Sequence, residues 1–135
     1  SLSPAIIVQV VKGEELLLAR HANRNTDVYT CLAGYVEPGE TLEDCVRREI
    51  KEETAIEVKN VKYITDQSWP FPNQMMFGFT AEWDKGTIDI DKTEIEDAQW
   101  FRYDNLPKVP PPGTLAYHLI KKTQNEIKKS KDSMR

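Results

Sequence analysis

Three glutamates stand close together near the middle of the chain, at positions 49, 52 and 53. On an α-helix the spacing i, i+3 and i+4 places such side chains on one face, with Cβ atoms about 5–6 Å apart. Like charges at these spacings destabilise an isolated helix, so a positive charge is expected beside Glu49, Glu52 and Glu53. Two interpretations are open. The carboxylates are either hard oxygen ligands for Mg²⁺ or Mn²⁺, or a solvated helix face that Arg47 and Arg48 partly neutralise.

The sequence around these glutamates predicts a helix that begins at Thr41. Pro38 and Gly39 form a turn pair just before it, and Thr41 with Asp44 makes a capping box. Apolar side chains then recur at helical spacing at Leu42, Cys45, Val46 and Ile50. One face of the helix is therefore expected to pack on a core while another face presents the carboxylates.

The rest of the sequence predicts the elements that would position this helix. Segments 5–11 and 15–20 are typical of a β-hairpin with Gly13 in its turn. Further strands are expected at 28–34, 57–67, 75–83 and 97–103. After a run of prolines, Gly113 and Thr114 favour the start of a C-terminal helix. This order predicts an α/β fold in which helices cover a mixed β-sheet.

Length and composition limit the class of protein to which the chain can belong. With 135 residues and 39% apolar content, residues 1–135 are expected to form one globular domain whose tail, from about residue 128 to 135, is frayed. No apolar run approaches the roughly 20 residues of a membrane helix. No secretory signal is visible, so a cytoplasmic protein without a membrane contact is expected. The spacing of Cys31 and Cys45 suits no zinc or redox motif, and both are expected to be buried and unpaired.

The net charge of −4 argues against general adhesion to nucleic acids, because phosphate-binding surfaces normally carry net positive charge. The C-terminal segment 119–135 departs from this balance, with six basic residues against two acidic ones. It is expected to form an amphipathic helix. Its basic side chains are either a solvated face or a contact for RNA or a protein partner, and the sequence leaves both open.

The glutamates belong to a longer pattern with fixed internal spacings. Its members are Gly34, Glu40, Arg48, Glu49, Glu52, Glu53 and Ile56. This pattern resembles the Nudix box of the Nudix hydrolases almost position for position. The departure is Ala55, where the family has glycine at the end of the helix. If Ala55 adopts the left-handed conformation usual at such a position, alanine costs on the order of 1 kcal/mol there.

The resemblance implies a fold and a role for each matching residue. The Nudix fold is a mixed β-sheet sandwiched between α-helices, and its box helix carries divalent metal ions, here Mg²⁺ or Mn²⁺. The residues that would hold these ions and carry the catalysis are Glu49, Glu52, Glu53 and Glu94. Glu94 matches an extra glutamate that the family has in a later loop. Gly34, Glu40 and Arg48 would support them, Arg48 by ion pairing, and which carboxylate is the general base stays open.

A second stretch, 66–79, looks like the sequence array that marks the NADH pyrophosphatase branch of this family. The matching positions are Gln67, Trp69, Pro70, Phe71 and Pro72, and the differing ones are Asp66, Ser68 and Gln74. The prolines make the loop around the aromatic residues stiff. The resemblance implies that Tyr35, Gln67, Trp69 and Phe71 bind the substrate. From the residues alone, Trp69 and Phe71 would equally well fill the core beneath that loop.

The activity implied is metal-dependent hydrolysis of a diphosphate linkage, with NADH or NAD giving nicotinamide mononucleotide and AMP. The resemblance also implies a small-molecule nucleotide substrate and a homodimer in which the second copy completes the dinucleotide site. Longer members of the branch carry an N-terminal domain and a four-cysteine zinc ribbon that this chain does not contain. It is therefore expected to be an excised domain or a short relative.

Other activities stay open at this point. Within enzymes they are hydrolysis of ADP-ribose or of dinucleoside polyphosphates, and removal of NAD caps from RNA. Outside enzymes, a Nudix-fold sensor would bind a nucleotide diphosphate without hydrolysing it. His21 and His118 are isolated from the box in sequence, so each is expected to be a surface or helix-face histidine rather than a base.

Overall fold

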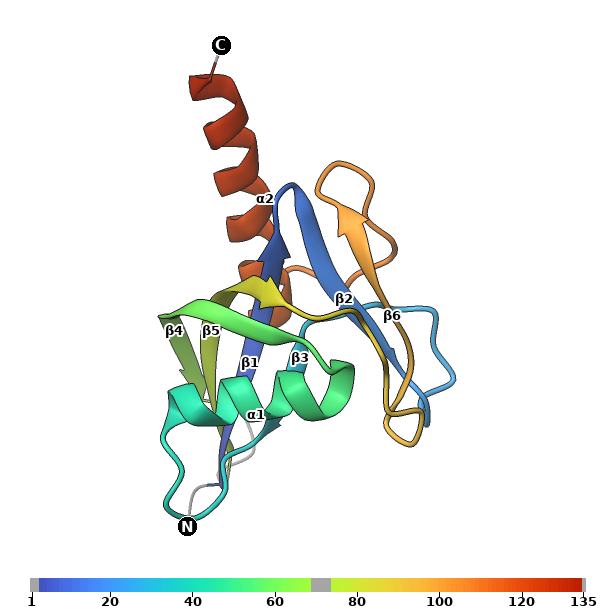
Figure 1. The fold of residues 1–135 in the computed structure, drawn as a ribbon, viewed down its shortest axis with the longest axis vertical. Coiled ribbons are helices and arrows are strands. Elements are labelled where there is room, and N and C mark those ends of the chain that lie inside the picture. The colour runs from blue at the N-terminus through green and yellow to red at the C-terminus, as the bar shows by residue number, and fades with distance from the viewer. Residues whose placement is uncertain (1–2, 69–73, 135) are drawn as a thin grey trace.

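The computed structural model of the protein describes residues 3–68 and 74–134 (Figure 1). The elements occur in the order expected from the sequence. They are β1 (Ser3–Lys12), β2 (Glu15–His21), β3 (Leu32–Tyr35), α1 (Leu42–Thr54), β4 (Glu57–Ser68), β5 (Gln74–Lys85), β6 (Ile95–Arg102) and α2 (Leu115–Ser133).

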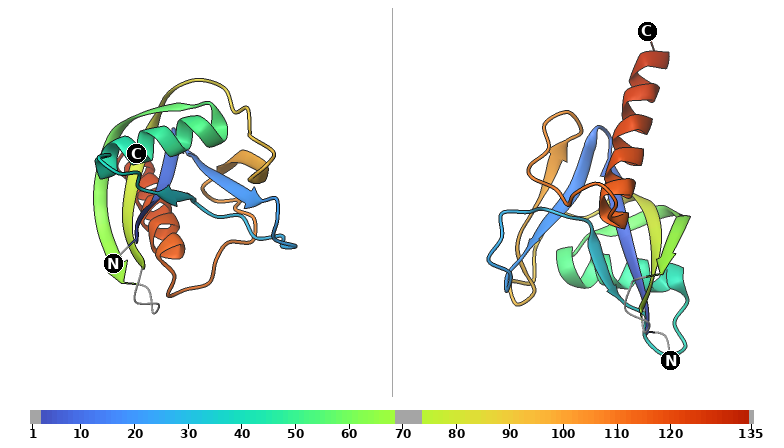
Figure 2. Two further views of the ribbon diagram at one scale, coloured as in Figure 1. Left: turned by 90° about the horizontal axis from the view of Figure 1, so that it is seen from below. Right: turned by 180° about the vertical axis from the view of Figure 1, so that it is seen from behind.

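The strands form one six-stranded sheet in the order β4-β5-β1-β2-β6, with β3 also paired to β1. The sheet is mixed, because β1 and β5 run parallel while the other pairs are antiparallel. Helix α1 packs on one face and α2 on the other, which Figure 2 shows in its left-hand view. The predicted α/β arrangement of a mixed sheet between helices is therefore confirmed.

Strand β1 is forked. Its last residues, Val11 and Lys12, pair with β2, whereas the stretch from Ala5 to Val8 pairs with β3. Beyond the turn, β2 separates from β1 and pairs with β6 along its length. We call β2 and β6 the second arm, and β1, β3, β4, β5 and α1 the first arm. The separation of the two arms is visible in Figure 1.

Gln9 lies at the branch point of the fork and is fully buried. Its amide donates hydrogen bonds to the Leu17 carbonyl at 2.9 Å and to the Val10 carbonyl at 3.0 Å. Its own carbonyl accepts a weak contact from the Cys31 thiol at 3.3 Å. Buried carbonyl groups need a hydrogen-bond donor. At the fork, the Gln9 side chain gives the Leu17 carbonyl the hydrogen bond that a neighbouring strand would otherwise make.

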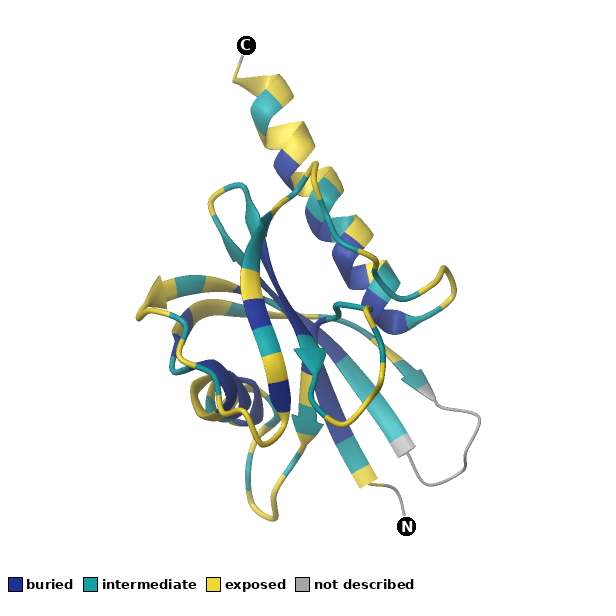
Figure 3. Cartoon of the chain, turned by 90° about the vertical axis from the view of Figure 1, so that its right-hand side faces the viewer, coloured by how far each residue is buried: buried dark blue, intermediate teal, exposed yellow. Residues whose placement is uncertain are grey.

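The two helices are held by the caps and apolar faces that the sequence predicts. The Thr41 hydroxyl accepts from the Asp44 amide at 3.1 Å and begins α1. Thr114 caps α2 in the same way, accepting from Tyr117 at 3.2 Å. Figure 3 shows that the sheet-facing side of α2 is buried while its far end is mostly exposed.

Helix α2 is continuous through Ser133, whereas fraying was expected from about residue 128. Ile127 is buried against the sheet, and Lys131 forms an ion pair with Glu14 in the β1–β2 turn. These contacts explain why the helix extends beyond its apolar stripe. Neither helix in residues 3–68 and 74–134 is long and apolar enough to cross a membrane.

Candidate active site

The acidic face of α1 lies against β3. Glu49 and Glu53 are buried, while the Glu52 side chain is 56% exposed. A Cβ atom on Gly34 would stand 2.1 Å from Cδ of Glu49, so any other residue at this point of β3 would displace the Glu49 carboxylate. Gly34 therefore admits the Glu49 carboxylate directly against the backbone of the sheet.

Arg48 supplies the positive charge that the glutamate spacing required. Its guanidinium binds Glu40 through two hydrogen bonds, Nε to Oε2 at 2.6 Å and a terminal nitrogen to Oε1 at 3.0 Å. It also donates to Glu49 at 2.9 Å, to Glu52 at 3.1 Å and to the Tyr35 carbonyl at 3.0 Å. Arg48 thus orients two of the three box glutamates and ties them to the end of β3.

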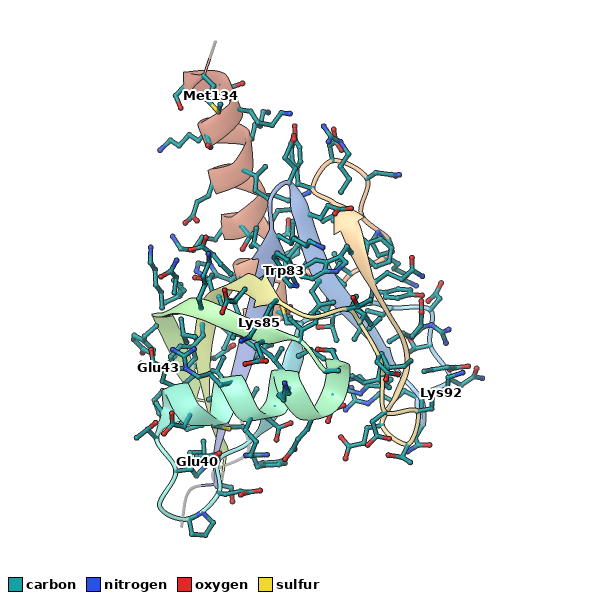
Figure 4. All side chains as sticks on the ribbon, viewed as in Figure 1. Glu40, Glu43, Trp83, Lys85, Lys92 and Met134 are labelled. Atoms are coloured by element: carbon teal, nitrogen blue, oxygen red, sulfur yellow. The ribbon has the colours of Figure 1, made fainter. Side chains whose placement is uncertain are left out.

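Glu40 supports Arg48 from the turn before α1, where Figure 4 labels it. Besides binding Arg48, its carboxylate accepts from the Glu37 amide at 3.0 Å. These donors lower the pKa of Glu40 to about 2, the Arg48 guanidinium being the largest cause. The pKa of Arg48 is raised in return, first by Glu40 and then by Glu49. In the structure Glu40 touches Arg48 rather than the other carboxylates of the site.

Glu53 lies in the opposite electrostatic situation. Burial raises the pKa of its carboxyl, and the neighbouring carboxyl of Glu94 raises it further. Its Oε2 atom is buried and has no hydrogen-bond partner among the residues that the structure describes. A buried carboxylate without a donor is costly, so this is the point of the site where a cation would be most stabilising.

Glu94 reaches Glu53 from the loop that joins β5 to β6. The Asp91 amide of this loop donates to the Glu53 carbonyl at 3.2 Å. The Asp91 carboxylate accepts from the amide and hydroxyl of Thr93 at 3.0 and 2.7 Å, and its carbonyl accepts from the Glu94 amide at 3.3 Å. Figure 4 labels Lys92 in this loop. The loop is therefore tied to the C-terminal end of α1.

The described residues fit a hard divalent cation in chemistry but are not already gathered around one. In residues 3–68 and 74–134, no three His, Cys, Asp or Glu side chains are arranged to hold a metal ion. Arg48 instead holds Glu49 and Glu52. The donors are all carboxylate oxygens, which Mg²⁺ and Mn²⁺ prefer, and one oxygen of Glu53 finds no hydrogen-bond partner in the described part of the chain.

The structure describes only some of the residues that were predicted to bind the substrate. Tyr35 lies at the end of β3 and is 60% exposed. Its backbone carbonyl accepts a hydrogen bond from Arg48, which places it next to the site. Gln67 lies near the end of β4, paired with Met76, and is half-buried. Trp69 and Phe71 lie outside the described residues, so their assignment as substrate-binding residues stays a prediction.

His21 lies nearer the box than its place in the sequence indicates. It is half-buried and lines a small cavity of about 20 Å³ together with Glu53 and Glu94. Burial lowers the pKa of His21, and Arg24 lowers it further. No spacing in the sequence relates His21 to the box, because the pairing of β2 with β6 is what brings it there. His118 is exposed on α2, as expected.

Residues 2–121 match the NUDIX domain, and the chain belongs to the Nudix hydrolase family. The chain is 52% identical over 122 residues to the NAD-capped RNA hydrolase NudC of Erwinia tasmaniensis, covering 90% of this chain and 47% of that protein. It is 52% identical over 122 residues to the protein of the same name from Salmonella typhi, covering 90% of this chain and 48% of that protein. The chain thus spans about half the length of these curated relatives.

Solved structures confirm the fold. A MutT Nudix hydrolase from Burkholderia pseudomallei superposes with a TM-score of 0.71 at 18% identity, covering 90% of this chain and 97% of the other. A Nudix-family hydrolase from Clostridium perfringens does so with a TM-score of 0.74 at 14% identity, covering 95% and 97%. At such low identity the likeness shows the fold alone.

Proposed function

We propose that this chain hydrolyses the diphosphate linkage of NADH or NAD, giving nicotinamide mononucleotide and AMP. The observation that carries the proposal is the buried Glu53 oxygen, which has no hydrogen-bond partner in residues 3–68 and 74–134 and lies next to Glu94 and one helical turn from Glu49. The retained Gln67-x-Trp69-Pro70-Phe71-Pro72 array and the relatives named as NAD-capped RNA hydrolases support the choice of substrate.

Mg²⁺ or Mn²⁺ would be held by the carboxylates Glu49, Glu52, Glu53 and Glu94. A divalent cation at this site would neutralise the diphosphate and acidify the attacking water. Arg48 orients Glu49 and Glu52, and its two hydrogen bonds to Glu40 would remain if a cation drew those two carboxylates away. Glu94 is exposed while Glu53 is buried, so a ligand would reach Glu53 from the side of Glu94.

The reaction needs a proton acceptor for the attacking water. The box glutamates and Glu94 are carboxylates at the site that can accept this proton. Glu53 is held in place by the helix and by the loop amide of Asp91.

Removal of NAD caps from RNA is a second candidate, favoured by the printed name of the relatives. The bond cleaved would be the same diphosphate linkage, so the carboxylates would act identically. The net charge of −4 gives RNA no general attraction to the chain, and recognition would have to begin at the nicotinamide end.

The experiment is a substrate panel with Mg²⁺ and with Mn²⁺, in which products are separated by chromatography. NADH, NAD, ADP-ribose, a dinucleoside polyphosphate, dGTP and NAD-capped RNA are compared. We expect NADH to give AMP and the reduced mononucleotide, with no products after chelation. Binding of NADH without turnover would instead identify a sensor, and faster hydrolysis of dGTP than of NADH would overturn the choice of substrate.

We also propose that two copies of the chain associate and that the protein works in the cytoplasm. The resemblance to the NADH pyrophosphatase branch supports the homodimer, since there a second copy completes the dinucleotide site. Analytical ultracentrifugation across a range of concentrations tests it. A monomer that hydrolyses NADH at full rate would contradict the proposed need for a partner.

A further inference from the structure

His21 reaches the candidate site because β2 and β6 change register beside it. Arg20 pairs with Asp97, but the next residue, His21, pairs with Ile95, so Glu96 is the extra residue of a β-bulge. Arg20 holds this bulge through an ion pair with Glu96 at 2.8 Å. Bulges redirect side chains and are common beside active sites. Here the bulge places His21 opposite the residue that follows Glu94.

The backbone carbonyl of Glu94 is held from the second arm. The Ala22 amide donates to it at 3.0 Å. The His21 ring lies beside Glu94 in the wall of a small cavity that Glu53 also lines. The β2 end therefore fixes the backbone of Glu94 from one side, while Asp91 fixes it from the side of α1.

The His21 ring also forms part of the wall behind the two carboxylates. The cavity it lines, with Glu53, Glu94 and the apolar Leu32 and Ile95 among the other lining residues, has a volume of about 20 Å³. A space of this size accommodates about one water molecule. A ring removed from this wall would leave Glu94 free to move away from Glu53.

We propose that His21 is a positioning residue: its ring packs beside Glu94 while the Ala22 amide holds the Glu94 carbonyl, so that the Glu94 carboxylate stays beside Glu53. This rests on the proposed function in that the Glu53–Glu94 arrangement is taken to be needed for hydrolysis. The role is not that of a base, because His21 acts on Glu94 and not on the substrate.

The test compares wild type with His21→Ala, with His21→Gln and His21→Asn, which keep a polar side chain at the cavity wall, and with His118→Ala as the exposed-histidine control. Steady-state kinetics with NADH and backbone amide hydrogen exchange are measured on each. We expect His21→Ala to lower kcat about 10-fold to 100-fold with KM changed less than about twofold. At least one amide variant should recover most of kcat, and the control should resemble wild type.

Hydrogen exchange gives the second readout. In His21→Ala the Ala22 and Ile95 amides should exchange faster, while the amide of Ile50 within α1 keeps its protection. Unchanged kcat and unchanged exchange at Ala22 would overturn the proposal. A loss of kcat that neither amide variant recovers, with faster exchange throughout α1, would also overturn it by showing general destabilisation. If wild type hydrolyses no substrate of the panel, the proposed function fails, and exchange at Ala22 and Ile95 still decides whether His21 fixes Glu94.

Discussion

Less than two turns apart on α1, Arg48 and Glu53 experience opposite electrostatic environments. Arg48 is surrounded by carboxylates, which raise its pKa, and Glu53 by other acids and apolar neighbours, which raise the pKa of its carboxyl. The carboxylates around Arg48 neutralise its charge within the protein. The charge of an ionised Glu53 is neutralised only by an added cation or by protonation, so substitutions at Arg48 and at Glu53 have different effects.

Glu53→Gln should lower NADH turnover by about a hundredfold or more, because it removes one charge from the site with little change in shape. The melting temperature should not fall at neutral pH. The folded-state pKa of Glu53 is raised, so ionising it above the unfolded-state value destabilises the fold, and a neutral amide avoids this effect. Kinetics and calorimetry on the same preparation check both expectations.

The matched control is Glu57→Gln, which removes an exposed carboxylate whose partner is Lys51 at 3.1 Å. This variant should retain wild-type turnover and lose little stability, since exposed ion pairs contribute little. Wild-type turnover in a folded Glu53→Gln protein would show that Glu53 is not part of the metal site.

Glu40→Gln should make the stability of the protein less sensitive to acid. Because the pKa of Glu40 is lowered to about 2 in the fold, its contribution is present above the unfolded value of about 4.5 and is lost as the pH falls toward 2. The groups facing its carboxylate are Arg48, the Glu37 amide and the Cys45 thiol. The melting temperature should therefore be lower than that of wild type at pH 7, and the difference should vanish near pH 2.

Glu43→Gln serves as the comparison for that pH series. Glu43 pairs with Arg47 at 3.8 Å and both side chains are about half exposed, so only a small shift in melting temperature is expected. Equal shifts in melting temperature in the two variants at every pH would show that the Arg48–Glu40 contact contributes no more to stability than the exposed Arg47–Glu43 pair.

At the residue scale, sequence reasoning located the box and its charges but not the rest of the site. The spacing of Glu49, Glu52 and Glu53 and the need for a cation were readable because one helix carries them all. His21 was missed since its place depends on strand pairing and on a bulge.

At the scale of elements, the end of α1 contains a departure from the Nudix pattern. Ala55 has φ 65° and ψ 6°, the left-handed conformation that was foreseen for it, and its amide donates to Lys51 at 2.9 Å. Ala55→Gly should therefore stabilise the protein by about 0.5–1 kcal/mol, because glycine adopts this conformation without a Cβ clash. Chemical denaturation measures the change.

Ala116→Gly tests whether that gain belongs to the left-handed position. Ala116 is buried inside α2 with ordinary helical geometry, so glycine there should destabilise the protein by about 1 kcal/mol. A loss of stability in Ala55→Gly as well would mean that the strain at Ala55 is smaller than the added freedom of the unfolded chain.

Gln9→Leu should cost about 1–3 kcal/mol, because it leaves the Leu17 carbonyl buried without a donor at the branch of β1. Gln99→Leu on β6 removes an exposed amide that donates to Asp97 and should cost less. Urea unfolding of both variants gives the comparison. A Gln9→Leu protein as stable as wild type would show that another donor reaches Leu17.

The elements were largely predictable from local signals. The hairpin turn at Gly13 and the caps at Thr41 and Thr114 depend on neighbouring residues only, and all three occur. The strand expected at 28–34 is shorter, Leu32–Tyr35, because only a single bridge between Ala19 and Thr30 joins the preceding residues to β2. The length of α2 was underestimated, since Lys131 finds its partner in a distant turn.

At the scale of the whole molecule, the choice of substrate depends on surfaces outside the box. Tyr35→Ala should weaken NADH cleavage more than ADP-ribose cleavage, by about fivefold in relative kcat/KM, since one aromatic stacking contact is worth on the order of 1 kcal/mol. Only NADH carries the nicotinamide on which Tyr35 would stack. Measuring kcat/KM for NADH, ADP-ribose and dGTP checks this expectation.

Tyr63→Ala is the control for loss of an exposed aromatic ring. Tyr63 lies on β4, is 51% exposed and packs beside Phe79, so both substrates should be affected alike. Equal losses on NADH and ADP-ribose in Tyr35→Ala would assign Tyr35 to the fold or to the shared half of the substrates.

The mixed sheet between two helices could be predicted as a class, but its branching could not. Nothing in the segment 5–11 indicates that one half pairs with β3 and the other with β2. That division depends on a single buried amide, Gln9, and on contacts between residues far apart in sequence.

The fork in β1 gives the carboxylates a property that neither arm has alone. Glu53 belongs to the first arm, and Glu94 lies just before β6 of the second arm, so the two carboxylates meet across the fork. A ligand that contacts both carboxylates therefore also joins the two arms. Gln9, at the branch point, contacts the Cys31 thiol in the wall of the cavity that both carboxylates line, so its packing links the branching of the sheet to the candidate site.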